Sequence, residues 1–177
     1  YSWMDIDSLF FMNPSDYPKI EPILKSIQSW DRIASAESYG AGAYGVLYSK
    51  LRKYYNNLPD PKIFTTSVLE KALTESLQHI IKYFGSNEVK LGSFQKLVRG
   101  DKEIPIFGLP DVISSMGTAP YKEGMRKVVS GESYIELVKF TKEGVEIESI
   151  ISYGSSDHKQ SKHFNDQMEY YANQKTK

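Results

Sequence analysis

The sequence predicts an α+β fold, and three features of the chain indicate it. Apolar residues recur at helical spacing through the first half, up to about Phe84. Two runs rich in β-branched and aromatic residues, 134–140 and 145–151, flank a short turn that contains Gly144, which predicts a β-hairpin. A short closing helix is expected at about 161–172.

The order of these elements predicts how the chain is organised. Residues 1–88 form a mainly helical segment, and residues 89–177 supply a connection, the hairpin and the closing helix. Several Pro and Gly residues up to Met125 predict that the connection is irregular, of the kind that lines a site or covers a partner. We expect the helices to pack around the hairpin, and the chain to be a fragment of one larger domain.

Composition narrows the possible partners. The chain has 177 residues with 22 basic and 22 acidic side chains, so its formal net charge is zero. Nucleic acids and anionic membranes both favour a basic excess, so neither is expected as a partner. The absence of Cys excludes disulfides and thiolate metal sites. No stretch approaches the roughly 20 apolar residues of a membrane span.

Large apolar side chains crowd the first 13 residues. Such a surface predicts contact with another part of a larger protein. The side chains are Trp3, Met4, Ile6, Leu9, Phe10, Phe11 and Met12.

Helix boundaries can be placed from capping patterns. Apolar residues at helical spacing predict one helix over residues 20–30, and Pro residues within 58–61 break the chain. A second helix is predicted to begin at Ser67, with Glu70 completing a capping box, and to end at Gly85.

Two short glycine motifs resemble binding signatures. Residues 40–45 match the G-x-G-x-x-G dinucleotide pattern, but helical segments flank them and no strand is expected before Ser35. We interpret them as a helix face of small residues, with nucleotide binding as a weaker alternative. Arg99-Gly100-Asp101 matches an integrin-binding tripeptide and is interpreted as a turn.

The three histidines do not predict a metal or catalytic centre. His79 falls within a core helix, and His158 and His163 lack the spacing of a metal pair. No Ser-His-Asp or Cys-His set can be assembled. In the expected closing helix, four side chains share one face, either as solvated surface or, as we favour, as an anchor for the chain end: His163, Asp166, Gln167 and Tyr170.

Several short motifs follow one another in a distinctive order. They are Trp30-Asp31-Arg32, Glu37-Ser38, Phe84-Gly85-Ser86, Leu91-Gly92, Arg99-Gly100-Asp101, Gly131-Glu132-Ser133-Tyr134 and Ser161-Lys162-His163-Phe164-Asn165-Asp166-Gln167. This order resembles the C-terminal part of the penicillin amidase family, whose members include penicillin, cephalosporin and acyl-homoserine-lactone acylases. The resemblance covers roughly residues 20–171.

The chain also departs from the family pattern. It has Leu91–Gln95 where the family often has Trp-Gly-Asp-x-His, and Tyr153–Ser156 where Gly-Gln-Ser-Gly is usual. Lys162 replaces a Pro, and Phe164 replaces a Tyr. These changes leave the acyl substrate undetermined.

The resemblance implies an N-terminal-nucleophile amide hydrolase with a four-layer αββα fold, exported to the periplasm or secreted. In that family the nucleophilic Ser, the first His, the oxyanion Asn and the calcium ligands lie upstream of this segment, and Tyr1 cannot be the nucleophile. The chain alone is therefore expected to be inactive and to hold no cofactor. Its expected partner is the rest of the acylase, meaning the α subunit and the N-terminal part of the β subunit.

One residue of the chain is a candidate for the active site. By resemblance, Glu132 orients an active-site His that lies outside this chain, fixing its tautomer and favouring its charged form. The alternative, which we slightly favour from the sequence, is a structural carboxylate at the strand entry, bonded to local backbone amides. For the whole chain, the alternative function is a non-enzymatic protein-interaction module, which the 13 Tyr and the apolar start would suit.

Overall fold

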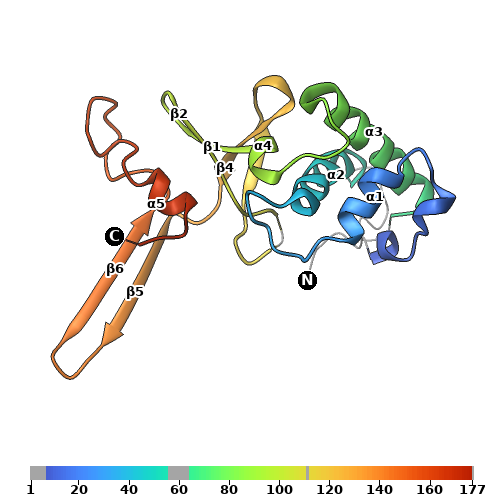
Figure 1. The fold of residues 1–177 in the computed structure, drawn as a ribbon. Helices are drawn as coiled ribbons and strands as arrows, with labels where there is room; N and C mark the ends of the chain where they lie inside the picture. Colours follow the sequence, from blue (N-terminus) through green and yellow to red (C-terminus); the bar gives the residue numbers. More distant parts are fainter. Residues whose placement is uncertain (1–6, 56–63, 111, 177) are drawn as a thin grey trace.

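A computed structural model describes residues 7–55, 64–110 and 112–176 (Figure 1). Helices gather at one end of the molecule, a β-hairpin projects from the other, and a small sheet lies between them (Figure 1). The expected α+β class is confirmed. The predicted chain break at 58–61 lies outside the described residues.

The helical end consists of α1 (Glu21–Gln28), α2 (Tyr39–Tyr55), α3 (Thr66–Phe84) and the single turn α4 (Leu91–Phe94). The apolar stripes of these helices face one another and bury a common set of side chains, which we call the helical core. Its fully buried large members include Leu24, Ile27, Leu47, Leu51, Leu69, Leu73 and Ile80.

The chain start is more buried than we expected. Two short 3₁₀ turns, η1 (Asp7–Phe10) and η2 (Pro14–Asp16), lead into α1. Leu9 is fully buried in the helical core and Met12 nearly so, because the Gln28 amide holds this segment through the backbone carbonyls of both residues. Phe11 is the one described member of the apolar start that is largely exposed, at 88 %. Trp3, Met4 and Ile6 lie outside the described residues.

The glycine motif at 40–45 belongs to α2, as the packing interpretation predicts. A Cβ at Gly42 would collide with the Val89 carbonyl oxygen, so only Gly allows the chain before α4 to cross the helix this closely. A Cβ at Gly40 would likewise collide with the Trp30 side chain. Both glycines are buried, and no strand lies between residues 7 and 39, the described part of the chain before the motif, so the motif lacks the strand that the dinucleotide alternative requires.

The predicted end of α3 is confirmed, and its predicted start is wrong by two residues. Gly85 caps the C-terminus in the left-handed conformation at φ 66°. The N-cap is Thr65, whose Oγ1 accepts the Val68 N–H at 3.4 Å, rather than Ser67. Thr65 lies one turn before the apolar stripe that guided the prediction.

The prediction of an irregular connection is wrong in part: strands of a four-stranded sheet lie within it, and its described residues between 106 and 116 are irregular. The strands of the sheet are β1 (Gln95–Arg99), β2 (Lys102–Pro105), β3 (Gly117–Pro120) and β4 (Arg126–Ser130), in the order β2-β1-β4-β3. Two of the prolines that suggested irregularity, Pro105 and Pro120, are the last residues of the edge strands β2 and β3, where a missing N–H is tolerated. The 3₁₀ turn η3 (Lys122–Gly124) joins β3 to β4, and Gly100 makes the expected turn between β1 and β2.

The hairpin forms where the sequence predicts it. Strands β5 (Tyr134–Phe140) and β6 (Val145–Ile151) pair antiparallel, with Tyr134 opposite Ile151 and Phe140 opposite Val145. The expectation that the helices pack around it is wrong. Helices α1–α3 bury their apolar stripes against one another, and the hairpin is held only at its base (Figure 1).

A second core joins the sheet, the hairpin base and the C-terminal helix. It contains Leu97, Ile104, Ile106, Phe107, Met116, Val128, Ile150, Met168 and Tyr171. The helix, α5, spans only Met168–Ala172, so the prediction of a helix from 161 is wrong. Residues 161–167 form turns, because the Ser161 hydroxyl accepts the His163 N–H and competes with helical hydrogen bonding.

Candidate functional site

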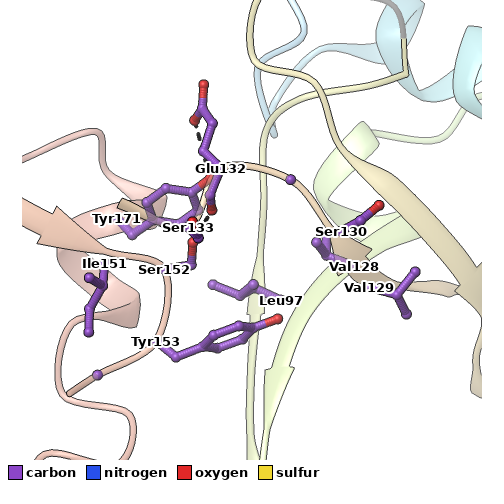
Figure 2. A pocket seen from close by; sticks show the side chains of 12 residues that line it. Leu97, Val128, Val129, Ser130, Glu132, Ser133, Ile151, Ser152, Tyr153 and Tyr171 are labelled. Atoms are coloured by element: carbon purple, nitrogen blue, oxygen red, sulfur yellow. Dashed lines mark hydrogen bonds between the residues drawn. The ribbon is translucent and has the colours of Figure 1, made fainter. Parts of the chain in front are cut away.

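Glu132 lies in the link between β4 and β5, at a pocket between the sheet and the hairpin base. The pocket has a volume of about 340 Å³. Figure 2 shows Glu132 above Ser152 and Tyr171, with Leu97 and Tyr153 farther down. The walls of the pocket come from Leu97 and Val128 on the sheet side and from residues 151–154 on the hairpin side.

A second hollow shares two lining residues, Glu132 and Tyr171, with the first pocket. It measures about 210 Å³, lies under the hairpin base, and is lined by Glu132 and Tyr171 together with Phe107, Ile135 and Lys175 among others. The Glu132 carboxylate thus sits between two hollows, half-buried and reachable from outside.

Two hydroxyl groups hold Glu132. The Tyr171 hydroxyl donates to its carboxylate at 3.4 Å, and the Ser152 hydroxyl donates to its backbone carbonyl. Burial raises the pKa of the Tyr171 hydroxyl to about 12, so this group stays a protonated donor at physiological pH. Among the described residues, no backbone N–H donates to the carboxylate. The 3.4 Å bond is long for O–H···O, so the carboxylate keeps most of its accepting capacity.

The C-terminal segment is tied down as an anchor, although not through a helix. His163 Nδ1 and Asp166 are 3.0 Å apart, and the Gln167 side-chain oxygen accepts the Ile151 N–H at 3.0 Å. The Arg99 guanidinium stacks over the Phe164 and Tyr153 rings and donates to the Ser156 carbonyl. The favoured anchoring role is confirmed for Gln167, whereas the His163–Asp166 pair lies within the segment itself. Tyr170 takes part in neither the His163–Asp166 pair nor the Gln167–Ile151 hydrogen bond.

His79 serves the packing of the helical end. Its Nε2 lies 2.7 Å from the Gly124 carbonyl and its Nδ1 lies 3.2 Å from Lys50 Nζ, so it ties α3 to the η3 turn. Burial lowers the pKa of His79, and the nearby cations Lys50 and Arg126 lower it further. The His79 imidazole is far in the fold from the Glu132 pocket and lines none of it.

Metal and membrane features can be stated for the described residues only. Within 7–55, 64–110 and 112–176, no three His, Cys, Asp or Glu side chains gather where they could hold a metal ion. In the same ranges, every helix is too short or too polar to traverse a lipid bilayer.

Tyr171 and Ser152 are the site residues that the sequence did not reveal. Glu132 was found through the Gly-Glu-Ser-Tyr motif, but Tyr171 lies 39 positions later and Ser152 lies 20 positions later. Neither belongs to a motif that includes Glu132. Ser152 lies near Glu132 because β6 returns alongside β5, and Tyr171 lies near it because α5 docks there. The predicted hairpin could therefore have suggested Ser152 but not Tyr171.

Known proteins similar to this chain are acylases. The chain is 26 % identical over 179 residues to the acyl-homoserine lactone acylase PvdQ of Pseudomonas savastanoi pv. phaseolicola, and equally so to that of Pseudomonas fluorescens, with 89 % of this chain covered in each case. It is 30 % identical over 118 residues to PvdQ of Pseudomonas syringae pv. syringae, covering 65 % of this chain and 15 % of that protein.

A profile of the penicillin amidase family matches residues 7–177. The chain belongs to the penicillin amidase family, and the resemblance drawn from its motifs is confirmed. The chain spans only 23 % of the length of the first two relatives.

Proposed function

We propose that this chain is the C-terminal part of an amide-bond acylase that removes an N-acyl group from a β-lactam, a homoserine lactone or a similar amide. Membership of the penicillin amidase family over residues 7–177 carries the proposal. The short span relative to the acylases it resembles supports placing the nucleophile elsewhere in a longer protein. On this proposal the chain alone is inactive.

In the longer protein the chemistry follows the N-terminal-nucleophile scheme. The hydroxyl of an N-terminal Ser attacks the amide carbonyl, its proton passes to the Ser α-amine and then to the leaving amine, and water hydrolyses the acyl-enzyme. Hydrogen-bond donors stabilise the oxyanion of each tetrahedral intermediate. Nucleophile, donors and any calcium ligands lie outside this chain, and so does the signal for export to the periplasm or for secretion.

The exposed side of the hairpin supports a larger assembly. Because side chains alternate along strands, one face of β5–β6 carries Tyr134, Val138, Phe140, Val145 and Ile147, which we call the open face. All five side chains are exposed, with Phe140 at 80 % and Ile147 at 60 %. We propose that the rest of the acylase, its α subunit and the N-terminal part of its β subunit, covers this face and that the hairpin joins a four-layer αββα fold.

For Glu132 we propose the role of orienting the active-site His of the longer protein. The carboxylate is half-buried at a pocket, and its described hydrogen-bond donor is a distant hydroxyl rather than local backbone amides. This arrangement favours an external partner over a purely local role. A carboxylate in contact with a His selects one tautomer and stabilises the imidazolium.

The test of this role uses the full-length protein. Glu132→Gln keeps the shape of the side chain and removes its charge, so kcat on acyl-homoserine lactones or penicillins is expected to fall by about 10²- to 10⁴-fold, as for other His-orienting carboxylates. Glu146→Gln is the matched control, because Glu146 is exposed on the strand face opposite the open face and lines neither hollow. Unchanged kcat in a folded Glu132→Gln protein would reduce Glu132 to a structural residue.

Fragment status has its own test. We expect this chain, expressed alone, to show no hydrolysis of these amides. Hydrolysis above background would contradict the proposal that the nucleophile lies elsewhere.

A second candidate function, a non-enzymatic protein-interaction module, is favoured by the open face. The two candidates differ in the longer protein. The acylase requires an internal Ser that becomes N-terminal after chain cleavage, which mass spectrometry of the purified protein detects. An uncleaved protein without hydrolytic activity would favour the module.

A further inference from the structure

The Glu132 carboxylate can work as an orienting group only if it is itself held in place. A glutamate side chain has three rotatable bonds, and orientation within about 0.5 Å demands that neighbouring groups restrict them. Glu132 lies in an irregular link between two strands, where no sheet hydrogen bonds fix the backbone. The groups that fix it must therefore come from other elements.

We propose that Tyr171 and Ser152 are positioning residues that hold Glu132 from two sides, so that the C-terminal end of the chain forms the support of the active-site carboxylate. This inference rests on the proposed role of Glu132. Ser152, just after β6, donates its hydroxyl to the Glu132 backbone carbonyl. Tyr171, on α5, donates its hydroxyl to the carboxylate at 3.4 Å.

Tyr171 is itself rigidly placed. Its side chain is 3 % exposed and its ring lies 5.5 Å from the Phe107 ring, within the second core. Its helix is fixed at the N-terminal end, because Gln167 binds the chain at the end of β6: its side chain accepts the N–H of Ile151, the last strand residue, and its N–H donates to the Tyr153 carbonyl, two residues later, at 2.9 Å. The hydroxyl position is thus set by the core and by two backbone bonds.

No charged side chain in the two hollows is described as bonded to the Glu132 carboxylate in place of Tyr171. The sheet and hairpin residues that share the two hollows with Glu132 are apolar, glycine or serine, and the titratable groups there are Tyr153, Tyr171 and Lys175. Tyr153 lies under the Arg99 guanidinium, and Lys175 lies on the tail after α5. The described structure gives neither of them a hydrogen bond to the carboxylate, whereas the Tyr171 hydroxyl donates to it.

The experiment uses the full-length enzyme and steady-state kinetics. Tyr171→Phe keeps the ring contact with Phe107 and removes only the hydroxyl. We expect kcat to fall by about threefold to tenfold with KM unchanged, the loss of one long hydrogen bond to a charged group. Ser152→Ala is expected to lower kcat similarly, and it provides a second reading should Tyr171→Phe fold poorly. Tyr170→Phe on the same helix, which lines neither hollow, is expected to leave kcat unchanged.

A double substitution separates positioning from a general structural effect. In a Glu132→Ala background there is no carboxylate to hold, so adding Tyr171→Phe is expected to lower kcat no further. A fall of the same size in that background would overturn the inference, as would a wild-type kcat for both Tyr171→Phe and Ser152→Ala in an enzyme that Glu132→Gln inactivates. Full activity of Glu132→Gln itself would instead overturn the role of Glu132, and with it this inference.

Discussion

The helical end and the hairpin use the same kinds of apolar side chain with opposite results. Leu47, Leu73 and Ile80 are fully buried because three helices of this chain face one another. Phe140 and Ile147 are 80 % and 60 % exposed, because the hairpin contacts the second core only at its base, through Ile135 and Ile150, and no described residue covers the other face. Within the described residues, the chain therefore buries the apolar stripes of its helices and leaves most apolar side chains of its hairpin exposed. Membership of a family of longer proteins gives the difference a physical reason.

The largest difference in stability between the two regions is expected for a substitution in the helical core. Leu73→Ala removes a fully buried side chain and leaves a cavity, so the free energy of unfolding should fall by about 2–5 kcal/mol. Urea denaturation of this chain expressed alone measures it. The matched control is Ile81→Ala on the same helix, where the side chain is 47 % exposed and the change should be about 1 kcal/mol or less. Equal losses at both positions would contradict a core sealed by the helices alone.

The next effect depends on which form of the protein is studied. Ile147→Ser on the open face is expected to change the stability of this chain alone by about 0.5 kcal/mol or less. In the longer protein it should cost about 1.5–3 kcal/mol, the value of burying such a side chain. Denaturant melts of both forms measure the difference.

The opposite face of the same strand provides the control for this comparison. Glu146 is exposed and pairs with Lys139 at 2.9 Å, so Glu146→Ser is expected to have a small effect in both forms. An Ile147→Ser effect that is equally small in both forms would mean that the open face stays uncovered.

The smallest expected effect is a pH dependence of stability at His79, which links α3 of the helical end to the η3 turn of the sheet. Burial lowers the pKa of His79 below its ordinary 6.5. The His79 imidazole therefore binds a proton more readily in the unfolded chain than in the folded one. The stabilisation is therefore complete above about pH 6.5 and is lost as the pH falls through the lower, folded pKa. Thermal melts between pH 7.5 and 5 should decline less steeply for His79→Gln than for the wild type.

His158 is the control for this pH dependence, since its side chain is 86 % exposed. His158→Gln should keep the wild-type slope. Equal slopes for the wild type and His79→Gln would show that the contact of His79 with Lys50 and the Gly124 carbonyl does not depend on its neutral form.

The sequence predicted elements well where one local pattern is long. The stripe in α3, Gly85 as its cap and both strands of the hairpin follow from periodicity and turn chemistry alone. The small sheet was missed because its strands are four or five residues long, and Pro105 and Pro120 resemble breaks unless their place on sheet edges is known. The closing helix was overextended because Ser161 and His163 form local turns that compete with helix.

The candidate site was only partly accessible to sequence reasoning. Glu132 has a local motif, and the family resemblance identified it. Tyr171 and Ser152 have no such motif, because their contacts with Glu132 depend on how α5 docks against the end of β6. Packing of distant elements, rather than local pattern, places them there.

We propose that the rest of the acylase covers the open face of the hairpin in the longer protein. Hydrogen–deuterium exchange of peptides from 134–151, measured in this chain alone and in the longer protein, tests it most directly. We expect fast exchange at the far end of the hairpin in this chain alone and strong protection in the longer protein. Equally fast exchange in both forms would contradict it.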